Sequence, residues 1–247
     1  MVVVIKYIKR LFLIFFLCIV IFSCGKGRGD GESDELARLD RLSELIVNAE
    51  DKKRIGAFAE AIDELKLAIK LDASFIAAYY LMGVIYEQWG QKEEAIKSYQ
   101  AALRLDSNHV KSRLGLGSVY SSMVKNDLAI KQLKKVAELS PKNPDIYFKI
   151  ALEYWYLQRL PETAQYYQKV IELEPDHLQT HLNLASVYEK MGDWLKTLGE
   201  IETALYLAKQ KEDKYSIAIA DEKLKFIKGR MNLTDKDLEK RTQPPFD

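Results

Sequence analysis

The stretch Tyr79–His109, YYLMGVIYEQWGQKEEAIKSYQAALRLDSNH, decides the fold of this chain. It contains two segments in which apolar residues recur every three or four positions, and Gly90 separates the two segments. Apolar residues at that spacing lie on one face of an α-helix, and a glycine between two such segments favours a turn. The stretch therefore predicts two amphipathic helices that pack against each other as a hairpin.

The same pattern recurs every 34 residues along most of the chain. Five blocks align without a gap: 42–75, 76–109, 110–143, 144–177 and 178–211. Position 8 of each block is Gly or Ala, position 27 is Ala or Val, and position 30 is Leu. Small residues let two helices approach closely, and a fixed period of this length is typical of stacked helical repeats. The sequence thus predicts a chain of helix pairs.

This pattern resembles the tetratricopeptide repeat, a helix–turn–helix unit of the same length. The resemblance implies an all-α fold, a right-handed solenoid of five helix–turn–helix repeats within residues 34–211. Because the last repeat exposes an apolar face that no further repeat covers, we expect residues 212–233 to form a capping helix. Residues 234–247 are expected to be a disordered tail.

The residues between the helices agree with this prediction. Gly56, Gly90 and Gly192 occupy position 15 of their repeats, where the first helix should end. Residues that commonly cap helix N-termini precede the first helices of three repeats: Asn108, Asn143 and Asp176.

Residues 1–23 have the features of a secretory signal peptide. Three cations precede the apolar run 11–22, which is shorter than the roughly 20 residues that span a bilayer. The sequence around Cys24, Ile-Phe-Ser-Cys, resembles a bacterial lipobox, in which the cysteine is acylated and becomes the new N-terminus. We therefore expect a lipoprotein signal peptide and a lipidated Cys24; the alternative is an uncleaved signal anchor.

The segment 24–33 is rich in glycine and charge, so we expect a flexible tether. The lipobox resemblance implies a place in the bacterial cell envelope, and Gly25 after the cysteine favours the periplasmic face of the outer membrane. The whole chain has 37 Lys and Arg against 36 Asp and Glu, which gives no basic surface for nucleic acid. Cys18 and Cys24 are its only cysteines, so a disulfide framework is excluded from the repeats.

In tetratricopeptide-repeat proteins, positions 2, 5, 9, 12 and 13 of each repeat face a concave groove. Chaperone-binding members carry Lys, Asn and Arg there to hold a carboxylate, whereas this chain has apolar residues or serine. Aromatic residues are favoured at binding surfaces, so we expect this groove to anchor an apolar segment of a protein or peptide partner. The expected groove residues are Tyr80, Val84, Leu114, Phe148, Leu152, Trp155, Tyr156 and Leu182. The alternative is that some of them pack against neighbouring helices.

Polar residues interrupt this apolar strip. Glu87 occupies position 12 of the second repeat and Ser118 occupies position 9 of the third. Charged residues are expected at the two ends of the groove: Glu50, Lys53, Arg54, Glu189 and Lys190.

The sequence contains no nucleophile–base pair and no metal-ligand set that we can name, so we expect no enzyme activity, cofactor or metal. His177 and His181 have a spacing near that of a metal-binding pair, but a surface pair in a turn is the preferred interpretation. We therefore predict a membrane-anchored scaffold that assembles an envelope complex, such as a type IV pilus secretin. The alternative is a lipoprotein that assists a TRAP-type solute transporter in ligand delivery.

Overall fold

The computed structural model describes residues 29–234 and residue 237 of the chain. The expected signal peptide, Cys24 and most of the expected tail lie outside these residues. The described residues form eleven α-helices, numbered from α2. Their bounds are α2 Gly29–Arg54, α3 Phe58–Leu71, α4 Ile76–Gln88, α5 Lys92–Leu105, α6 Val110–Ser122, α7 Asn126–Leu139, α8 Pro144–Tyr156, α9 Leu160–Leu173, α10 Leu178–Met191, α11 Trp194–Gln210 and α12 Lys214–Met231.

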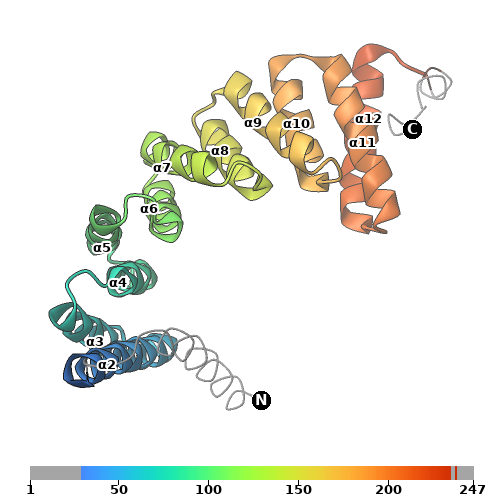
Figure 1. Cartoon of the computed structure of the whole chain (residues 1–247). Helices are drawn as coiled ribbons and strands as arrows, with labels where there is room; N and C mark the ends of the chain where they lie inside the picture. The colour runs from blue at the N-terminus through green and yellow to red at the C-terminus, as the bar shows by residue number, and fades with distance from the viewer. Residues whose placement is uncertain (1–28, 235–236, 238–247) are drawn as a thin grey trace.

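The helices pack as consecutive antiparallel pairs, from α2 with α3 to α10 with α11, and each pair packs against the next. Figure 1 shows the pairs following one another along a curved arc, with α4, α6 and α8 on its inner side and α5, α7 and α9 on its outer side. The predicted all-α solenoid of five helix pairs with a C-terminal helix is confirmed.

Helix α2 is longer than the first helix of a repeat. It begins at Gly29, so residues 29–33 are helical and do not form the flexible tether that their composition suggested.

The core consists of small apolar clusters, each shared between a helix pair and its neighbour. Alanines at the close-packed positions are fully buried, among them Ala61, Ala95 and Ala129. The last cluster contains Ala220 and Ile227 of α12, with Leu224 and Met231 packed beside them. Helix α12 therefore covers the apolar face of the last pair, as the sequence predicted.

The turns inside the pairs require a left-handed backbone. Gly56, Gly90 and Gly192 have φ of 79°, 82° and 77°, and glycine adopts this region at no steric cost. At the same position, Val124 and Gln158 have φ of 58° and 57°. The repeat alignment places both residues in a turn, but neither residue type favours positive φ, so the sequence did not indicate their left-handed backbone.

Helix capping follows the sequence only in part. The side chain of Asn143 accepts a hydrogen bond from the backbone N–H of Asp145, as expected. The caps of α6 and α10, however, are the imidazoles of His109 and His177, one residue after the expected Asn108 and Asp176. Among the described residues, no helix is long and apolar enough to cross a membrane.

Candidate partner-binding site

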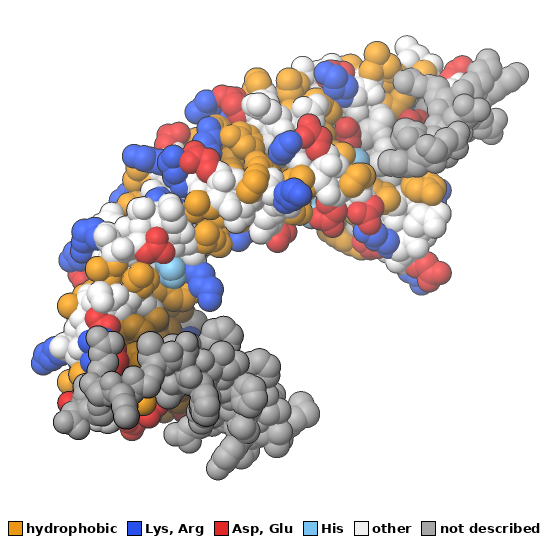
Figure 2. All heavy atoms as spheres, viewed as in Figure 1, with side chains coloured by type: hydrophobic (Ala, Val, Ile, Leu, Met, Phe, Trp, Pro, Cys, Tyr) orange, Lys and Arg blue, Asp and Glu red, His pale blue; other side chains and the backbone are white. Residues whose placement is uncertain are grey.

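The inner side of the arc carries apolar side chains in its N-terminal half, whereas charged side chains are scattered along the outer edge (Figure 2). Tyr80 and Val84 on α4 and Leu114 on α6 are half-buried, as predicted groove residues should be. The Tyr80 ring packs against His109, with 5.6 Å between the ring centroids. These three residues pack on the core and still expose part of their surface.

Beneath them lies Tyr99 of α5, which is only 1% exposed. Its ring fills a space between α4 and α6 that two glycines leave open. A Cβ atom on Gly83 would lie 2.5 Å from Tyr99 Cε1, and one on Gly115 would lie 2.7 Å from both Cε1 and the hydroxyl oxygen. Contact between α4 and α6 is more extensive than between other non-consecutive helices of the described chain. The glycines therefore let both helices close on the ring.

The Tyr99 hydroxyl group contacts a carboxylate in the groove, that of Glu87. It donates a hydrogen bond of 2.9 Å to Glu87 Oε2, and the Ser118 hydroxyl donates one of 2.7 Å to Glu87 Oε1. Burial and the neighbouring Glu87 carboxylate raise the pKa of Tyr99 well above its usual range. Glu87 is thus held in a fixed orientation by two neutral donors from two other helices.

In the C-terminal half of the groove, Phe148, Leu152 and Trp155 of α8 are half-buried. The Phe148 ring packs between two other rings, 5.5 Å from Tyr167 and 5.3 Å from His177. Much of Phe148 therefore serves the fold, which is the alternative that the sequence left open.

Trp155 and Tyr156 offer more surface. Lys190 Nζ of α10 lies 4.4 Å from the centre of the Trp155 ring, a cation–π contact. Tyr156, the next residue, is 64% exposed. These two aromatic residues are the expected groove residues best placed to be covered by a partner.

Leu182 is a wrong prediction for this surface. It is only 6% exposed and belongs to the apolar cluster that includes Ile201 and Ile227. The cluster is completed by α12, so the cap buries a residue that would be more open in an inner repeat.

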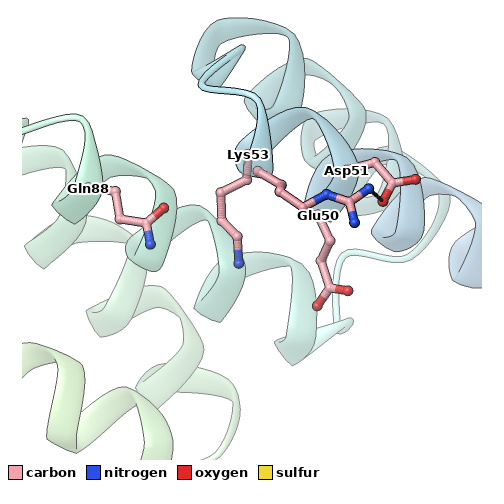
Figure 3. A pocket seen from close by; sticks show the side chains of 5 residues that line it. Glu50, Asp51, Lys53 and Gln88 are labelled. Carbon is pink, nitrogen blue, oxygen red and sulfur yellow. Dashed lines mark hydrogen bonds and ion pairs between the residues drawn. The ribbon is translucent and has the colours of Figure 1, made fainter. Parts of the chain in front are cut away.

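The N-terminal end of the groove has a shallow open pocket of about 520 Å³. It is lined by Glu50, Asp51, Lys53 and Arg54 of α2 and by Gln88 of α4, and Figure 3 shows Gln88 facing Lys53 across it. Arg54 is paired with Asp51 at 2.9 Å. The charges expected at this end of the groove are therefore present and lie together.

At the other end, Glu189 is paired with Lys223 of α12 at 2.8 Å, and Lys190 covers Trp155. Both charges predicted there are thus engaged within the chain.

The histidines differ from the predicted surface pair. His181 is only 5% exposed; its Nδ1 lies 2.7 Å from Glu200 Oε2 and its Nε2 lies 2.9 Å from the Pro175 carbonyl oxygen. Burial opposes the charged imidazolium, but the hydrogen bonds to Glu200 and Pro175 outweigh it and raise the pKa of His181. No group of three or more His, Cys, Asp or Glu side chains in the described residues could hold a metal ion.

Sequence reasoning recognised Glu87 and Ser118 only as separate polar positions. The network in which Glu87 accepts hydrogen bonds from both Ser118 and Tyr99 was missed because it joins three helices of two repeats. The signal was a tyrosine at position 24 accompanied by glycines at position 8 of its own repeat and position 6 of the next one.

Three segments of the chain match models of the tetratricopeptide repeat, residues 76–109, 110–143 and 144–177. These bounds are the same as those of the second, third and fourth repeats described above. Among curated proteins, no match is found.

Solved structures share the fold. A structure of MamA residues 41 to the end, from Desulfovibrio magneticus RS-1, superposes with a TM-score of 0.62 at 20% identity, over 71% of this chain and 98% of that one. Another MamA crystal structure gives 0.63 at 22% identity, over 71% and 96% of the two chains. YrrB, described as a TPR protein with an unusual peptide-binding site, gives 0.59 at 22% identity, over 72% and 90%.

These superpositions show that the chain shares the fold of the solved structures. Their low identity makes this a likeness of fold alone. Residues 76–177 therefore consist of three tetratricopeptide repeats, which lie inside a solenoid of five helix pairs and a terminal helix.

Proposed function

We propose that this protein is a membrane-anchored scaffold that binds a peptide segment of another protein along the inner side of its arc. The observation that carries the proposal is the strip of half-buried and exposed aromatic and aliphatic side chains on α4, α6 and α8. Apolar groups that converge on a concave surface supply most of the free energy of peptide binding. The likeness of fold to YrrB, which is described as having an unusual peptide-binding site, supports the same role. The proposal is one of binding and not of catalysis.

The groove is tested most directly at Trp155 and Tyr156. The full chain, purified in detergent, is immobilised and used to select peptides from a displayed library of random dodecapeptides. We expect enrichment of peptides with several apolar residues, and we expect Trp155→Ala/Tyr156→Ala to weaken their binding by about 10- to 100-fold, since truncated aromatic hot spots cost about 2 kcal/mol or more.

The matched control is Tyr215→Ala, because Tyr215 is 77% exposed on α12 and was not assigned to the groove. This variant should bind the selected peptides as tightly as the wild type. Equal binding by the control, the wild type and the double variant would contradict the groove proposal, provided that all three melt at the same temperature.

We also propose that lipid on Cys24 anchors the scaffold at the periplasmic face of the outer membrane. The support is the lipobox-like sequence, and two or more acyl chains give stable anchoring. Mass spectrometry of the protein isolated from its native membranes should find a diacylglyceryl group on Cys24 and no residues before it. An unmodified cysteine would contradict the anchor without affecting the groove.

The specific complex that we propose is an envelope assembly such as a type IV pilus secretin, on the basis of the layout of lipid anchor, tether and repeats. Deleting the gene in the native bacterium should reduce the amount of secretin multimer in the outer membrane, measured by immunoblot. A wild-type Trp155/Tyr156 pair should be required for rescue, whereas Tyr215→Ala should rescue fully.

A further inference from the structure

The partner-binding groove contains a carboxylate, that of Glu87, whose surroundings favour binding of a charged group in addition to apolar contact. Glu87 lies on α4, on the same helix face as Val84 and Tyr80, three and seven residues earlier. Glu87 is half-buried, and its hydrogen bond with Ser118 lies in an exposed position, whereas its bond with Tyr99 is partly buried. An acidic group is thus built into the apolar strip.

The two bonds that hold Glu87 leave it able to accept more. The Tyr99 and Ser118 hydroxyls each donate one hydrogen bond, and each goes to a different carboxylate oxygen. A carboxylate has about four acceptor positions, so about two remain available. The two donors come from α5 and α6, and they restrict the rotation of the side chain before any partner binds.

Neither of these partners carries a positive charge. In the described part of the chain, none of the ion pairs includes Glu87. A carboxylate that a partner covers without a compensating cation loses hydration at a cost. A charge-assisted hydrogen bond from Lys or Arg would compensate that cost and would be about twice as strong as a neutral one.

The neighbouring side chains suit a long basic residue. The methylene groups of Lys or Arg pack on apolar surface while the charged end reaches a polar group. Tyr80 and Val84 provide such a surface, both being packed on the cluster that contains Tyr99.

The C-terminal half of the groove has the opposite character. Position 12 of the fourth repeat is Trp155, and Lys190 of this same chain already lies over its ring. A partner cation is therefore not needed there. The charge complementarity of the groove places a basic residue of the partner at α4 and α6.

We propose that Glu87 is a recognition site for a Lys or Arg side chain of the bound peptide, so that the partner segment has a basic residue among apolar ones. This inference rests on the proposed function of the groove and names the chemistry of its partner. Glu87 acts as the specificity determinant, whereas Tyr99 and Ser118 act as positioning residues.

The test uses the same displayed dodecapeptide library on the full chain and on Glu87→Gln. Glutamine keeps the length of the side chain and can still accept a hydrogen bond from Tyr99, so matching thermal unfolding curves are expected. Peptides selected on the wild type should contain Lys or Arg at one fixed place within an apolar sequence. Peptides selected on Glu87→Gln should be equally apolar without that basic residue.

A double-mutant cycle then measures the contact. In a synthetic peptide from the wild-type selection, replacing the basic residue by norleucine should weaken binding to the wild type by about tenfold. The same replacement should have no effect on Glu87→Gln and an intermediate effect on Ser118→Ala. Lys190→Gln serves as the matched control, because it changes a groove charge at the other end and should leave the tenfold difference intact.

Three outcomes decide between the explanations. If selected peptides are apolar but carry no basic residue, or if norleucine costs nothing on the wild type, the inference is wrong and the proposed function stands; Glu87 then only satisfies the Tyr99 hydroxyl. If no peptide is enriched at all, the proposed function itself is contradicted, and this inference with it. Should Glu87→Gln unfold, the norleucine measurement on the wild type alone gives the answer.

Discussion

Two junctions between neighbouring repeats place a tyrosine at the same repeat position, but the surroundings of the two rings differ. In the Tyr99 junction the ring lies against Gly83 and Gly115, and its hydroxyl donates to the Glu87 carboxylate. In the Tyr167 junction the ring packs with Ala151 and Phe148.

The Tyr167 hydroxyl accepts a hydrogen bond of 3.1 Å from Asn183 Nδ2, and burial raises the pKa of Tyr167 to about 12. Asn183 occupies the repeat position that Gly115 occupies in the other junction. The comparison shows that a tyrosine at position 24 either lies between two closely packed helices or fills a wider gap. Which of the two occurs depends on the size of the residue at position 6 of the next repeat.

The largest expected effect is the loss of the ring itself. Tyr99→Ala should lower the free energy of unfolding by about 3–5 kcal/mol, because truncating a buried aromatic residue leaves a cavity that collapses only in part. Urea denaturation followed by circular dichroism measures this, with Tyr215→Ala as an exposed tyrosine control that should change stability by less than about 0.5 kcal/mol. A loss below 1 kcal/mol for Tyr99→Ala would show that the ring does not support the junction.

The second largest effect on stability is expected from adding a methyl group to Gly115. Gly115→Ala should destabilise by about 1–3 kcal/mol, since the new Cβ overlaps a ring that is enclosed on all sides. The matched control is Gly199→Ala in α11, where a Cβ meets nothing within 4 Å; it should stabilise by about 0.5–1 kcal/mol through helix propensity. Equal effects of the two substitutions on the urea midpoint would contradict the close packing of Gly115 against the Tyr99 ring.

Removing only the hydroxyl group should lower the free energy of unfolding by different amounts at the two tyrosines. Tyr99→Phe loses a bond to a carboxylate and should cost about 1.5 kcal/mol, whereas Tyr167→Phe loses a bond to a neutral amide and should cost about 0.5–1 kcal/mol. Tyr99→Phe should also weaken binding of basic peptides, because Glu87 loses one of its positioning donors. If Tyr167→Phe proves the more costly of the two, the role assigned to Glu87 in the first junction is wrong.

The smallest expected effect concerns pH and the second junction alone. His181 lies in α10, as does Asn183, and its pKa is raised above the ordinary 6.5. Its protonated form therefore contributes stability that is fully present below pH 6.5 and is lost as the pH rises through the higher folded-state pKa.

Hydrogen exchange of α10 amides should thus accelerate as the pH rises above 6.5, after correction for intrinsic rates, relative to the amides of α6. His181→Gln should abolish this difference. A pH dependence that is the same in both helices, or that persists in the variant, would contradict the assignment.

Most of the fold could be predicted from the sequence, because the repeat columns depend on contacts within one repeat or between adjacent ones. The turns inside three of the repeats were indicated by Gly56, Gly90 and Gly192, and the start of α8 was indicated by Asn143 followed by Pro144. The repeat period places Val124 in a turn, but its left-handed backbone could not be recognised, since a β-branched residue avoids that region.

Much less of the candidate site could be predicted. Trp155 and Tyr156 were selected from their repeat positions alone, and both keep exposed surface in the structure. Leu182 was misassigned because its burial depends on α12, which lies outside the repeats and follows no repeat column. His181 was misassigned because its partners, Glu200 and the Pro175 carbonyl, lie on other segments that no local spacing connects to it.

A solenoid of this kind is elastic, since its ends can separate or approach through small rotations at every pair of neighbouring repeats. The Tyr99 ring, enclosed by two glycines and tied to Glu87, resists such rotation because any change in the angle between α4 and α6 compresses an aromatic ring or breaks its bond. The second and third repeats should therefore move as one rigid block. Changes in the curvature of the molecule would then be concentrated on either side of that block.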